Sequence, residues 1–252
     1  MLEWLFRPEC AACGAMFSES EAAAGAPPLC GACAGSLLEL GPACPRCAEP
    51  TGARDAREVV CGRCRAAPLP LERIAVPWRF GGQLAAAIRR LKFAGRAHVA
   101  RDLAPLWAPL LAAAAAAAAA ADGADGAGGE RGGVVVPVPL HWRRRLARGY
   151  DQTWLLARHA CAAAGLPPPV PALRRARAAP PQSTLPAAAR QANLRGAFAV
   201  RRPDAIAGRA VILVDDVVTT GATLAAAAAA LHAAGAACVI GVALARATSA
   251  PG

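Results

Sequence analysis

Residues 211–223, VILVDDVVTTGAT, decide the fold of this 252-residue chain and indicate its chemistry. The aliphatic run at 211–214 is typical of a buried strand in a parallel sheet. Two adjacent carboxylates, Asp215 and Asp216, follow at the carboxyl end of this strand, where open α/β sheets bind their ligands. The small-residue loop 219–223 then leads into an alanine-rich helix. The pattern predicts an α/β fold with a binding site at this end of the sheet.

The loop 219–223 has the features of a phosphate site. A helix N-terminus offers free backbone N–H groups and the positive end of the helix dipole. Three threonine hydroxyls add donors, and Gly221 allows a close approach of the backbone. The two carboxylates would repel a phosphate, so we expect them to face hydroxyl groups such as a ribose diol. The loop matches neither GxxxxGK[ST] nor GxGxxG. An ordinary acidic turn between strand and helix is the alternative, but it explains neither the Asp pair nor TTGAT.

Eight of the ten cysteines form four C-x-x-C knuckles. Sixteen residues separate the first two knuckles, ten the middle two and thirteen the last two. Two such knuckles fold around one tetrahedral Cys₄ zinc, and four thiolates leave no open position for water, so we predict two structural Zn²⁺ sites. Pairing of neighbouring knuckles is the simplest arrangement, and interleaved pairing is the alternative. The predicted ligands are Cys10, Cys13, Cys30, Cys33, Cys44, Cys47, Cys61 and Cys64.

Disulfide bonds are the competing explanation of the cysteines. The start of the chain, MLEWLFRPEC, has an acidic third residue and no extended apolar core, so it does not resemble a secretory signal. We therefore expect a cytoplasmic protein, and disulfides are rare in that compartment. Residues 103–121 carry no charge over a bilayer-spanning length. However, they consist mainly of alanine and contain Pro105 and Pro109, so we expect a soluble helix and no membrane span.

Charge is distributed unevenly along the chain. Residues 1–73 carry seven arginines and nine acidic residues, a balance of −2, whereas residues 74–252 have a balance of +13. Residues 139–202 alone hold twelve arginines and a single acid, Asp151. Such a field attracts polyanions, either a diphosphate substrate or nucleic acid. Because Lys92 is the only lysine beside 27 arginines, it stands out from what we interpret as a compositional bias toward arginine.

A basic segment follows the predicted strand at 134–139. Its cationic residues and the glycine after them are Arg143, Arg144, Arg145, Arg148 and Gly149. Guanidinium groups bind phosphate oxygens through two hydrogen bonds at once, so this predicted loop is a candidate diphosphate site, with a solvated basic loop as the alternative. Trp142 and Tyr150 lie among the arginines. Base stacking on them is possible, but we expect them to pack under the loop.

The other elements follow from hydrophobic periodicity and from the positions of Gly and Pro. A Pro-rich linker at 65–73 predicts two domains, a double zinc ribbon over 1–67 and an α/β domain over 68–252. Residues 174–198 have little periodicity, which suits a mobile lid. Further strands are expected at 74–80, 134–139 and 237–245, and helices at about 81–95, 97–121 and 153–164.

Taken together, these motifs resemble the ComF/GntX family, in which a double zinc ribbon precedes a type I phosphoribosyltransferase-like domain with a mainly parallel sheet. The shared marks are the four CxxC knuckles, LKFAG, VPVPL…RRRLARGYDQ, PQSTL…R..N.RGAF and VILVDDVVTTGAT, over roughly residues 5–245. The last of these resembles the phosphoribosyl-diphosphate (PRPP) signature of type I phosphoribosyltransferases at all 13 positions. Family members usually have Asn where this chain has Asp151.

The resemblance implies a part in the uptake of single-stranded DNA during natural transformation, with other competence proteins as partners. It implies PRPP with Mg²⁺ as ligand. The alternative is an active phosphoribosyltransferase that moves ribose 5-phosphate from PRPP to an unknown nitrogen acceptor, without a role in DNA uptake. The implied PRPP-binding residues are Asp215, Asp216, Val217, Thr219, Thr220, Gly221, Ala222 and Thr223. The implied diphosphate-binding residues are Lys92, Arg143, Arg148 and Gly149.

Overall fold

A parallel sheet forms the centre of the computed structural model, which describes residues 8–23, 27–52, 59–121, 133–176 and 196–248. The strand order is β1, β7, β6, β3, and β2 pairs with the end of β7 beside β1. All of these pairings are parallel, which confirms the predicted α/β class. The strands are β1 (Arg73–Ala75), β2 (Trp78–Arg79), β3 (Val134–Pro137), β6 (Ala210–Val218) and β7 (Cys238–Arg246).

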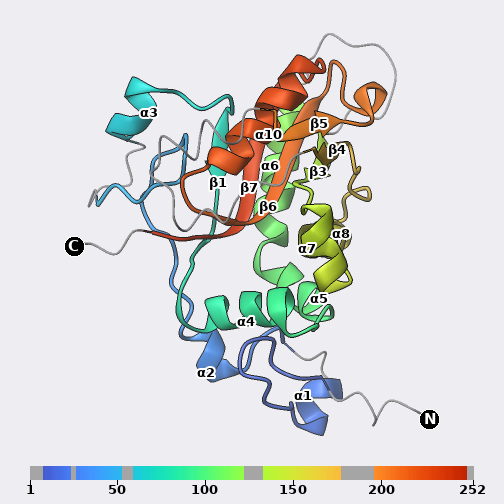
Figure 1. Cartoon of the computed structure of the whole chain (residues 1–252). Coiled ribbons are helices and arrows are strands. Elements are labelled where there is room, and N and C mark those ends of the chain that lie inside the picture. The colour runs from blue at the N-terminus through green and yellow to red at the C-terminus, as the bar shows by residue number, and fades with distance from the viewer. Residues whose placement is uncertain (1–7, 24–26, 53–58, 122–132, 177–195, 249–252) are drawn as a thin grey trace.

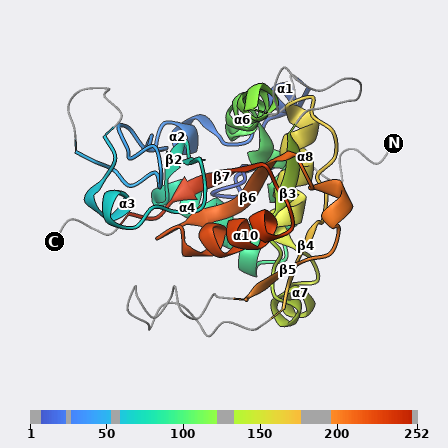
Figure 2. The same ribbon diagram turned by 90° about the horizontal axis from the view of Figure 1, so that it is seen from above.

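Helices cover both faces of this sheet (Figures 1 and 2). One face packs against α10 (Ala222–Ala233) and the other against α6 (Ala108–Ala121) and α8 (Gln152–Ala163). The shorter α5 (Val99–Leu103) packs against α8. Below them in Figure 1 lies α4 (Gly82–Phe93), whose C-terminal residues reach the carboxyl end of the sheet.

Side chains of β6 alternate between the two cores. Val211 and Leu213 lie in the core with α10, whereas Ile212 and Val214 lie in the core with α6 and α8. A strand with a helical layer on each face has no polar side, because successive side chains point to opposite faces and both faces are buried. The continuous aliphatic run was therefore a sound basis for predicting a central strand.

The apolar segment that we predicted as one helix over 97–121 is divided into three. It contains α5, a 3₁₀ turn at Ala104–Leu106 and α6. Pro105 and Pro109 lie at these breaks. The helix is interrupted there because proline has no N–H to donate to the preceding turn. In the part of the chain that is described, no one helix is long and apolar enough to cross a membrane. Val99–Leu106 and Ala108–Ala120 meet that criterion only together, with a bend of 63° between them.

The alanine tract of α6 has a buried and an exposed side although its residues are identical. Ala114 and Ala118 are buried, whereas Ala113 and Ala116 are exposed. At the start of β3, a Cβ placed on Gly133 would lie only 2.5 Å from the Cβ of Ala118. This close approach fixes how the helix lies on the sheet.

The basic segment after β3 is a helix, α7 (Trp142–Arg148), so our prediction of a loop was wrong. Arginine and leucine are good helix formers, and both ends are capped. The His141 side chain accepts a hydrogen bond from the Arg143 N–H, and Gly149 ends the helix with a left-handed φ of 80°.

Two other predicted segments differ in detail. The strand expected at 74–80 is interrupted around Pro77, which separates β1 from β2. The ends of the predicted lid form an antiparallel pair, β4 (Leu173–Arg175) and β5 (Phe198–Val200), and a 3₁₀ turn follows at Pro203–Ala205. The middle of the predicted lid, 177–195, lies outside the described residues.

The cysteine-rich segment contributes three short helices, α1 (Glu19–Ala23), α2 (Gly31–Ala34) and α3 (Gly62–Ala66). Its first half shares a hydrophobic core with α4, α5, α6 and α8, and its second half shares the core under α10. Each half of the ribbon therefore extends the layer on one face of the sheet. The buried cores run across the predicted domain boundary at residues 67 and 68, which itself stays a prediction.

An arginine of the α/β domain holds each half of the ribbon. Arg90 of α4 donates to the Cys10 carbonyl oxygen at 3.0 Å and forms an ion pair with Glu9 at 2.6 Å. Arg246, at the end of β7, is completely buried and donates to the Cys47 carbonyl oxygen and to Glu49. In both cases a guanidinium group joins a knuckle carbonyl to a nearby glutamate.

Candidate functional site

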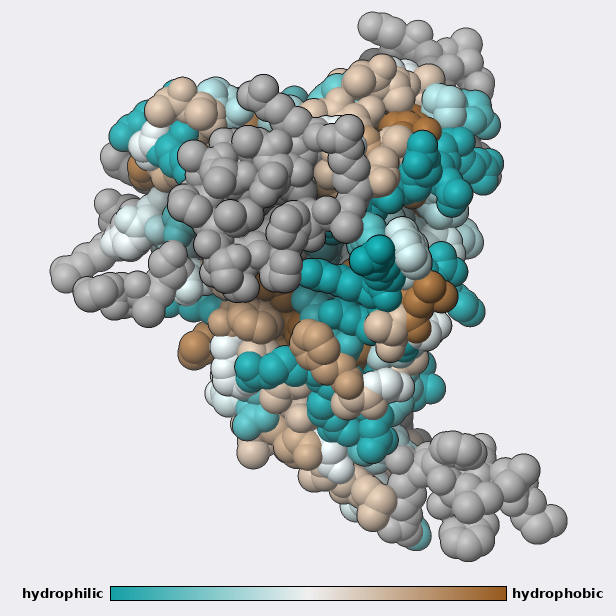
Figure 3. Space-filling view, viewed as in Figure 1, coloured by the Kyte–Doolittle hydropathy of each residue, from teal (hydrophilic) through white to brown (hydrophobic). Residues whose placement is uncertain are grey.

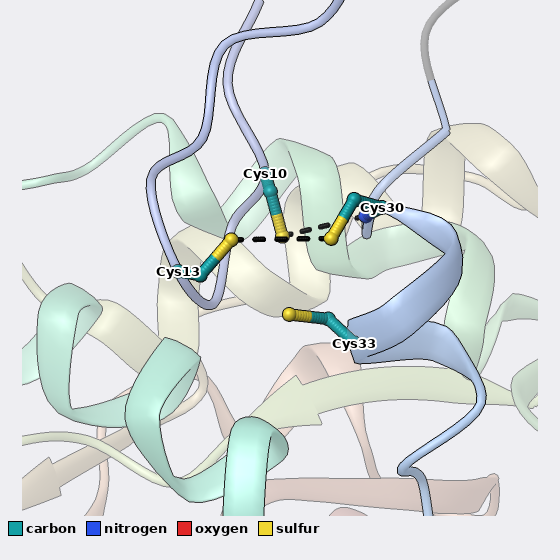
Figure 4. A group of neighbouring side chains, drawn as sticks. All are labelled: Cys10, Cys13, Cys30 and Cys33. Carbon is teal, nitrogen blue, oxygen red and sulfur yellow. Dashed lines mark hydrogen bonds between the residues drawn. The ribbon is translucent and has the colours of Figure 1, made fainter.

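The eight predicted metal ligands form two groups of four. In each group the sulfur atoms all lie within 4.8 Å of one another, and Figure 4 shows those of the first group pointing toward a common centre. The groups are Cys10, Cys13, Cys30 and Cys33, and Cys44, Cys47, Cys61 and Cys64. The predicted pairing of neighbouring knuckles is confirmed.

The distances between sulfur atoms fit a bound zinc ion. The Sγ atoms of Cys13 and Cys30 lie 3.9 Å apart, and those of Cys47 and Cys61 lie 3.7 Å apart. Zn–S bonds of about 2.3 Å in a tetrahedron separate the sulfurs by about 3.8 Å, whereas a disulfide bond would be about 2.05 Å long. The two clusters therefore have the donor set and the dimensions of structural zinc sites.

Backbone N–H groups stabilise a thiolate in each cluster. Burial raises the pKa of Cys10, but N–H groups that include those of Cys13 and Cys30 outweigh burial and lower its pKa to about 6. In the second cluster, burial likewise raises the pKa of Cys44, and backbone N–H groups that include that of Cys61 lower it to about 7. Each cluster thus presents an ionised sulfur near neutral pH, which is the form that binds a metal.

A pocket of about 190 Å³ lies at the carboxyl end of the sheet, where we predicted a binding site. Separate segments of the chain supply its charged side chains, which are Lys92 of α4, Arg144 and Arg148 of α7, Arg175 of β4, and Asp215 and Asp216 of β6. Thr223 of α10 also lines it. Figure 3 shows hydrophilic residues gathered over α7 and across the middle of this face.

Asp216 lies within the strand, because β6 continues to Val218 and does not end before the carboxylates as we expected. Its side chain is buried, and Oδ1 accepts a hydrogen bond from Lys92 Nζ at 2.8 Å. Oδ2 accepts one from Gln152 Nε2 at 3.1 Å. The pairing with Lys92 compensates the cost of burying the carboxylate. It also holds the ammonium group at the wall of the pocket.

Asp215 is only partly buried and has an oxygen available to a ligand. Its Oδ1 accepts the Asp216 N–H at 2.9 Å, and its Oδ2 has no hydrogen bond to any described residue. Burial and the negative charge of Asp216 raise its pKa to about 7, against the opposing effects of that N–H group, Lys92 and Arg175. At neutral pH the carboxyl group is therefore close to half protonated, and a ligand that interacts with the carboxylate would complete its ionisation.

The cationic wall of the pocket is ordered by contacts among its residues. Arg148 Nη1 donates to Gln152 Oε1 at 2.8 Å, and its guanidinium group lies over the Phe93 ring, 4.9 Å from the centroid. Gln152 thereby links Arg148 to Asp216. Arg175 brings a buried Nε that has no hydrogen-bond partner among the described residues. A buried donor without a partner is costly, so an anionic ligand here would satisfy it.

The helical geometry of α7 determines which of the predicted arginines line the pocket. Arg144 and Arg148 are four residues apart, hence on one face of the helix, and both line the pocket. Arg143 lies over the Trp142 ring instead, 5.2 Å from its centroid, and does not line this pocket. Gly149 does not line it either, since its role is to end α7. The four-residue spacing of Arg144 and Arg148 selects them over Arg143 only once the segment is known to be helical, and a helix of seven residues gave no clear signal in the sequence.

Sequence reasoning missed three other polar residues of the pocket: Gln152, Thr153 and Arg175. Two of them belong to or follow the GYDQ motif, where polar residues at a helix start were a usable signal. Arg175 lies in the segment that we predicted as a lid, and no local pattern separates it from its neighbours.

The loop 219–223 forms the N-terminus of α10, as predicted. Gly221 has a left-handed φ of 79°, and a Cβ on it would lie 3.2 Å from Ile74 Cδ1 and 3.4 Å from Leu69 Cδ1. Glycine is therefore required by the backbone and by the packing of the loop against the segment after the second zinc cluster. Thr220 Oγ1 accepts the Ala222 N–H at 3.3 Å.

Asp151 has a structural role at the start of α8. Its Oδ1 accepts the N–H groups of Thr153 and Trp154 at 3.0 and 3.1 Å, the usual pattern of a helix N-cap. Its Oδ2 accepts the Leu140 N–H at 2.9 Å. Both oxygens are thus used to fasten α8 to the segment after β3. Asp151 does not line the pocket with Asp215 and Asp216.

Comparison with known proteins agrees with this architecture. A double zinc ribbon domain model matches residues 1–65, and a phosphoribosyl transferase domain model matches residues 166–251. The DNA utilization protein YhgH of Salmonella typhi is 32% identical over 211 residues, which cover 84% of this chain and 87% of that protein. YhgH of Escherichia coli K12 has the same identity and coverage. Competence protein F of Haemophilus influenzae is 28% identical over 165 residues, 65% of this chain and 68% of that protein.

The fold, the two Cys₄ clusters and these matches define a double zinc ribbon joined to a type I phosphoribosyltransferase domain. The segment of the chain that carries the Asp pair and the TTGAT loop lies inside the matched transferase region. The chain belongs to the ComF/GntX family, as its motifs predicted.

Proposed function

We propose that the pocket at the carboxyl end of the sheet binds PRPP. The observation that carries this proposal is the meeting of two acidic and four basic side chains with Thr223 of the TTGAT loop in one pocket. PRPP has a diol, a monophosphate and a diphosphate, so its ligand site needs groups of both signs at separate places. The charged residues of the pocket supply both.

Each part of PRPP has a suitable partner. The 5-phosphate lies at the N-terminus of α10, where the first N–H groups of a helix have no partner within the helix. The diol lies against Asp215, whose second oxygen is available, with Asp216 behind it. The diphosphate lies against Arg144 and Arg148. Lys92 donates one of its three N–H groups to Asp216, and the other two are available to phosphate oxygens.

Mg²⁺ fits this site through the carboxylate of Asp215, a hard oxygen donor at the edge of the pocket. Such an ion supplies positive charge to the diphosphate and ribose oxygens when PRPP is bound. The two cysteine clusters do not compete for it, because their ligands are all sulfur.

We also propose that the protein takes part in handling single-stranded DNA, in the cytoplasm and together with other competence proteins. Support comes from the relatives, two of which are named for DNA utilization and one for competence. The balance of +11 over residues 139–202 is a second support, because phosphate contacts dominate the affinity for nucleic acid.

A transferase reaction is the second candidate function. Lys92, Arg144 and Arg148 gather on one wall of the pocket, where they would stabilise the charge that develops on a departing diphosphate. In that reaction the bond from the ribose C1 carbon to the diphosphate oxygen breaks while a bond to a nitrogen acceptor forms. Release of diphosphate on incubation with PRPP, Mg²⁺ and candidate acceptors tests it directly.

Calorimetry with PRPP and Mg²⁺ tests the binding proposal. Asp215→Asn should weaken binding about tenfold or more, because a neutral amide accepts more weakly than a carboxylate from the diol and from Mg²⁺. Asp204→Asn is the matched control, since Asp204 is exposed and does not line the pocket. Equal affinity in the Asp215 variant and the control, with unchanged melting temperatures, would show that the diol does not bind there.

A further inference from the structure

A second and larger cavity lies on the other side of the segment that follows β3. Its volume is about 780 Å³, four times that of the PRPP pocket, and it shares Pro139, Leu140 and Arg175 with that pocket. Nothing in the proposed binding of PRPP uses the rest of its lining. The side chains around it therefore indicate a different ligand.

Aromatic rings line this cavity. Trp142 is 57% exposed, so our expectation that it packs under the basic segment was wrong. Trp154 of α8 is half-buried in the same cavity. Tyr150 also lines the cavity, but its hydroxyl group donates to the Leu91 carbonyl oxygen and its ring packs against the core. The Arg143 guanidinium group lies over the Trp142 ring, and the rest of the exposed indole offers a flat apolar surface to a base.

The charges around this cavity are positive. Arg145, Arg174 and Arg201 line it and are exposed, and the last two come from the neighbouring strands β4 and β5 or directly after them. Among the described residues of the lining, Asp151 is the one acid, and both of its oxygens accept backbone N–H groups. The cavity thus combines flat rings with cations and has no carboxylate free to repel an anion.

We propose that this cavity receives a base of single-stranded nucleic acid, which stacks on Trp142 while the flanking phosphates contact Arg174 and Arg201. Base stacking on an aromatic side chain and arginine contacts to phosphate are the two interactions by which proteins hold single strands. A strand fits better than a free nucleotide, because the exposed arginines continue along α7 from Arg145 in the lining to Arg143 beyond the cavity. The inference rests on the DNA-handling part of the proposed function.

Fluorescence anisotropy of a labelled oligothymidylate of about 16 nucleotides with the full chain tests this site. Trp142→Ala should weaken binding between about 5-fold and about 150-fold, which is the range for loss of one stacked base. Trp142→Phe should restore most of the affinity, since it returns an aromatic face. The helix should tolerate both changes because Trp142 is exposed at its first turn.

A charge-matched pair of double variants tests the phosphate contacts. Arg174→Gln with Arg201→Gln should reduce the slope of log affinity against log salt by about 1.4, because each phosphate contact to a single strand contributes about 0.7. Arg158→Gln with Arg202→Gln removes the same charge from exposed residues that do not line the cavity and should change the slope much less. Calorimetry with PRPP should give equal affinities for all of these variants.

Each other outcome has a definite meaning. No oligonucleotide binding by the unaltered chain at low salt would overturn both this inference and the DNA part of the proposed function. Binding that Trp142→Ala leaves unchanged, or a slope that falls equally in both double variants, would overturn only the site. Equal competition by free thymidine monophosphate and by the strand would assign the cavity to a mononucleotide and overturn the inference for a strand.

Discussion

Replacement of either arginine that holds the zinc ribbon, Arg90 or Arg246, should make the loss of one metal ion easier and leave the other in place. In Arg246→Met the side chain keeps much of its volume but leaves the Cys47 carbonyl oxygen and Glu49 without their donor. Cys47 belongs to the second cluster, so local opening of that cluster should become easier. The first cluster is held by Arg90 and should stay closed.

The magnitude follows from burial. A hydrogen bond to a charged group contributes about 1.5–3 kcal/mol, and a buried carbonyl oxygen left without a donor costs a similar amount. The Glu49 side chain is 38% exposed, so its ion pair adds little. A loss of about 3 kcal/mol for Arg246→Met corresponds to local opening that is about 150 times more frequent. Arg90→Met should cost less, about 2 kcal/mol, because its side chain is partly exposed to water.

Thiol alkylation in the presence of a chelator, read cysteine by cysteine by mass spectrometry, measures this opening. Arg246→Met should accelerate alkylation in the second group of four cysteines, and Arg90→Met should do so in the first group. Arg79→Met is the control, since the one hydrogen bond of the Arg79 side chain to a described residue is long, 3.4 Å, and goes to the Leu40 carbonyl oxygen. Equal acceleration of both groups in either variant would refute the idea that each arginine stabilises its own cluster.

Three further predictions concern metal content, pH and the helix cap. Elemental analysis should find two zinc ions per chain. The double variant Cys44→Ser with Cys47→Ser should contain one zinc ion. Its melting temperature should be lower, because this cluster shares a core with the sheet. PRPP affinity, measured by calorimetry, should rise about tenfold from pH 6 to pH 8. The reason is that the pKa of Asp215 in the free protein is about 7 and binding requires its carboxylate. Asp215→Asn should remove that part of the pH dependence. The same raised pKa means that the stability from this group is fully present below its ordinary pKa of 3.8 and is lost as the pH rises from there through about 7. Asp151→Asn should keep the cap of α8 but lose the hydrogen bond from the Leu140 N–H, and the melting temperature should fall by a few degrees. An unchanged melting temperature would mean that this hydrogen bond contributes nothing to stability.

The central strand and the zinc ligands could be predicted because their signals are local. Residues 211–214 are apolar at every position, and only a strand buried on both faces needs this. The cysteine knuckles have fixed internal spacing, and the pairing of neighbours in order, the simplest arrangement, is the one that the structure has. Lys92 was found because a single lysine among arginines is conspicuous.

The contacts that complete the pocket depend on distant segments. Gln152 and Lys92 meet Asp216 across 64 and 124 residues of chain, and nothing in their own neighbourhoods specifies that meeting. The helix α7 was missed because its seven residues are too few for a clear period. Trp142 is exposed because it lies in that helix. Our prediction of a loop there therefore led to the wrong expectation for its side chain.

The alanine tract of α6 has a consequence for how this sequence can diverge. A run of one residue type conceals two different requirements, because Ala118 meets Gly133 with no room for a larger group while Ala113 and Ala116 face water. Exchange of the exposed alanines for glutamate or lysine leaves the contact with the sheet intact, whereas one added methyl group at Ala118 pushes the helix off β3. Relatives with less alanine should therefore carry charged residues at the outer positions and keep a small residue at the inner one.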